Sequence, residues 1–216
     1  MEDVFIIQDE ISLAIVRELK VRLLKTEETA VVKRHTVDTE AYELYLRGWY
    51  LIYRQHEGWM EKGIEYFKMA VEKDPNYALP YAGIAYCYNF CGMLSYMNPR
   101  VAYSHTKAAA EKALELDDML AEAHTALGYY KLMYAWDFSG AEKELKRAIE
   151  INPNYATGHH WYSMYFMCMG KFDEAIAEIH RARQLDPLSV LQNAIVGCWY
   201  SLARRYNEAL EYYEIA

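Results

Sequence analysis

The chain has 216 residues and a formal net charge of −8, with 53% hydrophobic and 25% charged residues. This composition can form a buried core and excludes an intrinsically disordered chain. An acidic chain of this size is poorly suited to nucleic-acid phosphates or an anionic membrane surface, because both require clustered Lys and Arg. We therefore expect neither a nucleic-acid partner nor a membrane partner.

Residues 1–40 are predicted to form one long N-terminal helix and a polar linker. Apolar residues in VFIIQDEISLAIVRELKVRLL recur about one helical turn apart, from Val4 through Ile11 to Leu23. The apolar stripe is wide for a helix that faces solvent. We therefore expect this helix to pack on the next domain or to pair with another chain.

Residues 41–216 contain five similar units, each with the pattern of two helices. The second helices end in short turns such as EKDP, EINP and QLDP, whose prolines lack the N–H that would continue a helix. Ala156 and Val190, which begin successive units, are 34 residues apart. Small or apolar residues recur in phase, and Gly48, Gly128 and Gly197 share one place in the first helix. The units span about 41–77, 78–120, 121–155, 156–189 and 190–216, the last of them incomplete.

This pattern resembles the tetratricopeptide repeat (TPR) family, whose 34-residue unit carries Leu-Gly, Tyr, Ala, Phe, Ala and Pro at fixed places. Lys131 stands where Tyr is usual, and His124 and His159 stand where Trp is usual. Insertions around NFCGMLSYMNPRVA and RQHEGWME are expected to lengthen two turns between paired helices. The resemblance implies an all-α, right-handed superhelical solenoid of antiparallel helix pairs, in which stacking of neighbouring pairs buries a continuous core.

A second resemblance joins the N-terminal segment FIIQDEISLAIVRELKVRL to AYELYLRG. This combination is similar to the C-terminal TPR region of large bacterial signalling proteins, where it follows a nucleotide cyclase, a winged-helix regulator or a protein kinase domain. It implies a regulatory role beside such a domain.

In TPR arrays the first helix of each pair lines a concave groove. The places expected to face it offer aromatic and thioether side chains rather than the Lys and Arg that grip a peptide carboxylate in some family members, so we do not expect a carboxylate clamp. The same side chains could instead pack against neighbouring repeats, and both interpretations are kept. The candidate partner-binding residues are Tyr42, Tyr45, Trp49, Tyr86, Asn89, Thr125, Tyr129, His160, Met164 and Met167.

The sequence shows no constellation for catalysis, a cofactor or a metal. It contains no glycine-rich phosphate loop, no zinc-protease motif and no nucleophile elbow. Cys87 and Cys91 lie one helical turn apart, and we interpret them as small core residues because no further ligands occur at matching spacing. We therefore expect a protein that is not an enzyme, with reduced cysteines that favour the cytoplasm.

The function expected from the sequence is a scaffold that binds a protein or peptide partner. The alternative is a regulatory module of a larger signalling enzyme. The last unit stops at Ala216 with an apolar face, although solenoids need polar caps. We therefore expect the natural chain to continue, and we expect this end or the N-terminal helix to be able to mediate self-association.

Overall fold

The computed structural model describes residues 35–54 and 58–215. Within them the chain forms ten α-helices, one π-helical turn and no strand. The predicted N-terminal helix lies outside the described residues. The elements are α3 (Thr39–Arg54), α4 (Trp59–Lys73), α5 (Ala78–Met93), α6 (Pro99–Leu116), α7 (Ala121–Tyr130), η1 (Lys131–Ala135), α8 (Phe138–Ile151), α9 (Ala156–Cys168), α10 (Phe172–Leu185), α11 (Val190–Leu202) and α12 (Tyr206–Ile215).

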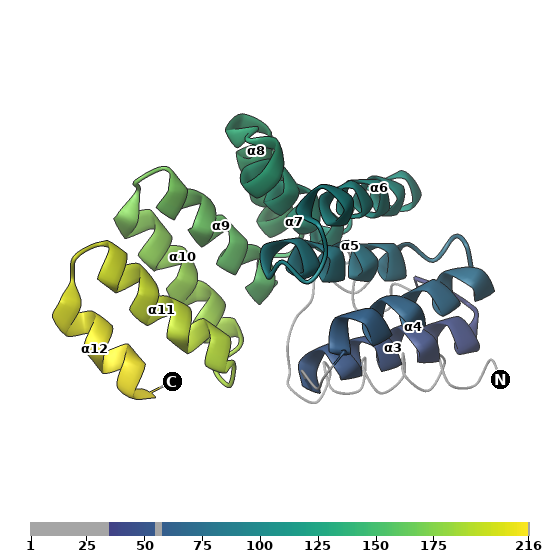
Figure 1. The fold of residues 1–216 in the computed structure, drawn as a ribbon, viewed down its shortest axis with the longest axis horizontal. Coiled ribbons are helices and arrows are strands. Elements are labelled where there is room, and N and C mark those ends of the chain that lie inside the picture. Colours follow the sequence, from purple (N-terminus) through teal and green to yellow (C-terminus); the bar gives the residue numbers. More distant parts are fainter. Residues whose placement is uncertain (1–34, 55–57, 216) are drawn as a thin grey trace, which may run out of the picture.

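The helices form a solenoid of antiparallel pairs. The first helices are α3, α5, α7, α9 and α11, and each packs on the second helix that follows it, while each second helix except α12 packs on the next first helix. The chain runs through an arch, from α3 and α4 over α5 to α8 and down to α11 and α12 (Figure 1). The predicted all-α solenoid is confirmed.

Local sequence signals explain where the helices begin and end. The side chains of Asn98, Asp137 and Ser189 each accept a hydrogen bond from a backbone N–H in the first turn of α6, α8 and α11. Pro99 occupies the first position of α6, where the missing N–H costs nothing. The turn between α5 and α6 is longer than the turn between α9 and α10, as the insertion in that unit predicts.

Small residues in the first helices let the paired helices approach closely. The ring of Phe67 on α4 is fully buried between Gly48 on α3 and Gly83 on α5. A Cβ atom on either glycine would lie 2.6 Å from that ring. Close helix packing therefore explains the glycine at the position that Gly48 and Gly128 share in their repeats. A Cβ atom on Gly128 would meet the Leu145 side chain in the same way.

Candidate functional site: an aromatic surface on the first helices

A continuous run of aromatic rings crosses from α3 to α5. On α3, the ring of Trp49 lies 6.4 Å from Tyr45 and 5.8 Å from Tyr53, centroid to centroid. Between the helices, Trp49 and Tyr86 are 5.2 Å apart, and on α5 Tyr86 and Phe90 are 4.8 Å apart. These distances are typical of interacting aromatic pairs. We call Tyr45, Trp49, Tyr53, Tyr86 and Phe90 the aromatic strip.

The aromatic strip is anchored in the core on one side and open on the other. Tyr45 and Trp49 contact the buried ring of Phe67 at 5.8 and 5.6 Å. Four members of the strip are half-buried, whereas Tyr53 is 78% exposed. Burial raises the pKa of Tyr86 above its ordinary value, so this phenol stays neutral. The strip can therefore offer rigid apolar contact area without adding charge.

The sequence-predicted candidates divide into two groups by exposure. Tyr42, Tyr45, Trp49, Tyr86, Met164 and Met167 are half-buried. Asn89, Thr125, Tyr129 and His160 are buried, with between 1 and 4% of each residue exposed. The second group offers little surface to a partner in this structure.

Tyr129 does not continue the strip beside Trp49 and Tyr86, although it occupies the same place in its unit. Trp161 on α9 packs on Tyr129 with ring centroids 4.3 Å apart, and it also reaches Phe90 at 5.9 Å. The Tyr129 ring therefore belongs to the core.

The buried polar candidates connect first helices to one another. The amide of Asn89 donates to the carbonyl oxygen of Ala126 at 3.1 Å and so links α5 to α7. His160 lies against Gln192 of α11, and burial lowers the pKa of its imidazole to about 4, outweighing the interaction with the Gln192 side chain, which raises that pKa. His160 is therefore a neutral core residue at physiological pH.

Sequence reasoning missed Tyr53, Phe90 and Trp161. Tyr53 and Phe90 follow Trp49 and Tyr86 by four residues, so the i, i+4 spacing on a helix could have found them. Trp161 gives no such signal, because its contact with Phe90 depends on how α9 sits beside α5 and α7.

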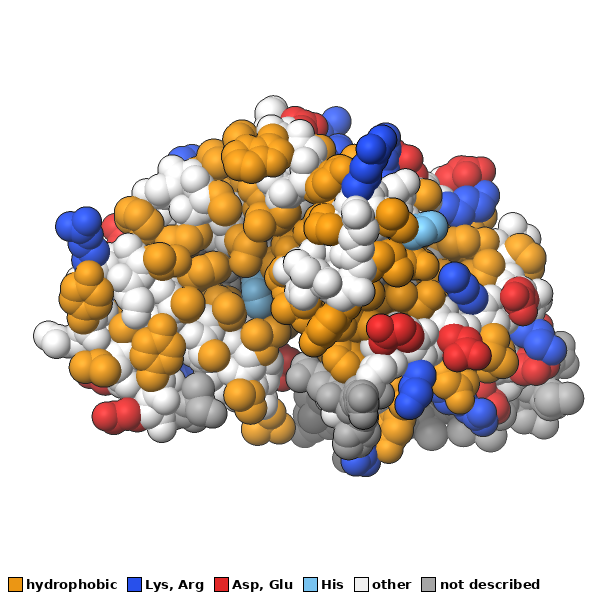
Figure 2. Space-filling view, in the orientation of Figure 1, with side chains coloured by type: hydrophobic (Ala, Val, Ile, Leu, Met, Phe, Trp, Pro, Cys, Tyr) orange, Lys and Arg blue, Asp and Glu red, His pale blue; other side chains and the backbone are white. Residues whose placement is uncertain are grey.

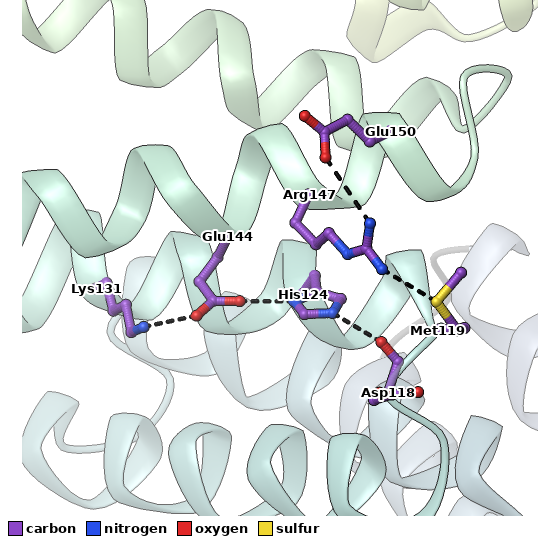
Figure 3. A network of polar contacts seen from close by, with 7 residues as sticks. All are labelled: Asp118, Met119, His124, Lys131, Glu144, Arg147 and Glu150. Atoms are coloured by element: carbon purple, nitrogen blue, oxygen red, sulfur yellow. Dashed lines mark hydrogen bonds and ion pairs between the residues drawn. The ribbon is translucent and has the colours of Figure 1, made fainter.

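A second surface feature is a polar network over α7 and α8 (Figure 3). Glu144 accepts from Nδ1 of His124 at 2.6 Å and from Lys131 at 2.8 Å. The hydrogen bond from His124 is the largest influence on Glu144, and together with Lys131 it lowers the pKa of that carboxyl to about 2. The network borders a hollow of about 430 Å³ lined by Asp118, His124, Lys143, Glu144, Lys146, Arg147 and Glu150.

The next pair of helices repeats this geometry, which indicates a structural role. His159 on α9 meets Glu178 on α10 at 2.6 Å and the carbonyl oxygen of Pro153 at 3.0 Å, as His124 meets Glu144 and the carbonyl oxygen of Asp118. Because the same His–Glu contact recurs in successive units, it stabilises the packing of each first helix on its second helix. We therefore assign the network to the fold rather than to a ligand.

The described part of the chain gives little support for a reactive cysteine, a metal site or a membrane-spanning helix. Burial raises the pKa of the Cys87 thiol well above its ordinary value and that of Cys91 to about 11, so both are poor nucleophiles. Their prediction as core residues is confirmed. Among the described residues, no three His, Cys, Asp or Glu side chains are placed to share a metal. None of the described helices has the length and apolar character needed to cross a bilayer.

Comparison with solved structures identifies the fold. The chain superposes on TTC0263, a TPR protein of Thermus thermophilus, with a TM-score of 0.67 over 82% of this chain and 89% of that chain, at 17% identity. The fold is that of a TPR solenoid. Yeast Tom70 gives a TM-score of 0.59 at 15% identity (83% of this chain, 37% of that chain), and Pseudomonas aeruginosa PilF gives 0.55 at 19% identity (81% and 74%).

Sequence comparison is less informative than structure. No protein-family model matches the chain. Anaphase-promoting complex subunit 3 of Schizosaccharomyces pombe is 20% identical over 128 residues, which are 59% of this chain and only 19% of that protein. At these identities the TPR likeness describes the fold alone.

Proposed function

We propose that the chain is a protein-interaction scaffold whose aromatic strip binds an apolar peptide or helical segment of a protein partner. The supporting observation is the uninterrupted set of ring contacts from Tyr53 to Phe90, open at Tyr53 and backed by the core. Aromatic anchors supply large contact area at low cost in conformational entropy, and they commonly dominate binding energy.

The side chains of the strip also set the chemistry of the partner. All five are aromatic, so they offer no cationic group for a carboxylate or phosphate. Recognition would rest on apolar burial and on hydrogen bonds to tyrosine hydroxyls. Binding should therefore depend only weakly on salt.

The test begins with selection of binders to the full chain from a library of short random peptides. A selected peptide is then titrated against wild type and against the Tyr53→Ala/Tyr86→Ala variant, with calorimetry as the readout. Loss of two anchors should weaken binding by about tenfold or more, which corresponds to ~1.4 kcal/mol. Peptides that bind both proteins equally well would refute the assignment of this surface.

Tyr50→Ala is the matched control. Tyr50 is an exposed tyrosine on the same helix, but its ring lies under the Arg54 guanidinium rather than within the strip. Its removal should leave the affinity unchanged. Circular dichroism of all variants should match wild type, because Tyr53 is mostly exposed and Tyr86 lies at the edge of the core.

A regulatory module of a larger signalling enzyme is the second candidate, and it rests on the resemblance carried by FIIQDEISLAIVRELKVRL and AYELYLRG. Both candidates use the solenoid to hold a protein surface. They differ in whether the bound surface belongs to a catalytic domain of the same protein. The coding sequence on both sides of this chain distinguishes them directly.

A further inference from the structure

Three cationic side chains of α8 line the hollow beside the polar network. Lys143, Lys146 and Arg147 are spaced i, i+3 and i+4, which places them on one side of the helix. All three border the hollow of about 430 Å³, and both lysines are exposed. A cationic surface of this kind stands out in a chain with a net charge of −8, so it calls for a local explanation.

The hollow also contains three carboxylates, of which two already have cationic partners. Both oxygens of Glu144 are used within the polar network. Glu150 lies 3.8 Å from Arg147 on the same helix (Figure 3). The third carboxylate, that of Asp118, is exposed. Among the described residues neither lysine forms an ion pair, so two unmatched ammonium groups face one unmatched carboxylate.

The two lysines are not part of the repeat pattern. Aligned on the last turns of the second helices, α10 carries Ala177 and His180 at these places, and α6 carries Ala108 and Glu111. Only the place of Arg147 holds a cation on all three helices. The His–Glu contact beside the hollow does recur, and it serves the packing of the pair. The packing of the repeats therefore does not explain the lysines.

The arrangement of charge favours separate carboxylates over one phosphate group. The cations are spread along a helix, about 5–6 Å apart between Cβ atoms. A dianion in the middle of the hollow would also face Asp118 and Glu150. A nucleic acid would extend beyond the cluster and meet a chain of net negative charge, whereas a short segment senses mainly the charges within about 8 Å at physiological salt.

We propose that Lys143, Lys146 and Arg147 form a second docking site, which binds an acidic helical segment of a protein partner with Asp or Glu residues one helical turn apart. Arg147 can take part because its exposed pair with Glu150 is of a weak kind. The site lies on α7 and α8 and does not rest on the aromatic strip of α3 and α5. Its binding is electrostatic and should fall with salt, in contrast to that of the strip.

The test uses the full chain and two synthetic helical peptides of equal length, one with Glu at i, i+3 and i+4 and one with Gln at the same places. Amide NMR spectra should show shifts in α8 with the Glu peptide only. Raising salt from about 50 to 300 mM should weaken this binding several-fold. Lys143→Gln/Lys146→Gln should weaken it about fivefold, and Lys143→Arg/Lys146→Arg should retain it.

Lys107→Gln/Lys112→Gln is the matched control. It removes the same charge from α6, where each lysine already pairs with a glutamate of its own helix, at 3.8 and 3.0 Å. The control should bind the Glu peptide like wild type, and circular dichroism of every variant should be unchanged, because the replaced side chains lie at the surface. Equal binding of the two peptides, or an equal loss in the control, would overturn the proposal. Tighter binding of inorganic phosphate or of a single-stranded oligonucleotide at α8 would overturn it as well.

Discussion

Each of the five turns between paired helices places one residue in the left-handed backbone region, and three of these residues recur at the same place of successive units. These three residues are Trp136, Gly170 and Arg204, spaced 34 apart, with φ of 56°, 70° and 60°. Gly170 adopts this conformation without strain, whereas a side chain there costs roughly 1–2 kcal/mol. Trp136 is also 73% exposed, so the fold gains little from its ring. Its identity at this place is therefore not explained by folding.

Replacing Trp136 by Gly should leave the free energy of unfolding unchanged or raise it by about 0.5 kcal/mol. Relief of backbone strain is worth roughly 1–2 kcal/mol, and the greater freedom of glycine in the unfolded chain offsets part of it. Urea denaturation followed by circular dichroism measures the change. Trp161→Ala is the comparison, because that ring is buried and its loss should cost about 3–5 kcal/mol. A loss above about 1 kcal/mol in Trp136→Gly would show that its ring packs into the fold.

Gly83→Ala should destabilise the chain by about 1–3 kcal/mol. The new methyl group would lie 2.6 Å from the Phe67 ring, and that ring cannot retreat because Gly48 confines it equally closely on its other side. Phe67→Leu in the same chain makes room and should recover part of the loss. A double-mutant cycle gives the interaction free energy between the two substitutions, which measures the steric clash between the new methyl group and the Phe67 ring. Additive effects on the free energy of unfolding would show that Gly83 is not needed to make room for the Phe67 ring.

At the scale of the elements, two adjacent histidines on α9 experience opposite environments. Burial lowers the pKa of His159, but the Glu178 carboxylate and the Pro153 carbonyl outweigh that effect and raise it overall. Its stabilising contribution is thus complete below the unfolded pKa and is lost as pH rises through the folded pKa. His160 is buried and neutral with a pKa of about 4, so its environment favours folding above pH ~6.5 and is increasingly unfavourable as pH falls toward 4.

Proton and carbon NMR titration of the imidazole groups should therefore give two separated midpoints. His159 should titrate above 6.5, its ordinary value, and His160 near 4. Glu178→Gln removes the carboxylate that faces His159 and should lower that midpoint while leaving His160 unchanged. Equal midpoints for the two histidines would contradict the packing described for α9.

The helix pairs could be predicted from the sequence because repeat phase, prolines and small residues act locally. The orientation of individual side chains could not, as Tyr129 and His160 show. Both stand at places expected to face a groove, but Trp161 packs on the first and Gln192 lies against the second. Those contacts depend on side-chain size in a neighbouring unit, which a position count within one unit does not include. Trp136 escaped prediction for a related reason, since no glycine marks its left-handed turn.

At the scale of the whole molecule, stability in a solenoid is approximately a sum over neighbouring units, so a terminal unit has less support than an internal one. On α10, Ile176 and Ile179 are covered, whereas Leu210 and Tyr213 on α12 are open. Figure 2 shows hydrophobic side chains spread widely over the half of the molecule that holds α9 to α12.

Backbone amides of α12 should therefore exchange with deuterium faster than those of α10 in dilute solution. Hydrogen-exchange mass spectrometry measures the difference between the two helices. Equal protection of α10 and α12 would contradict nearest-neighbour stability.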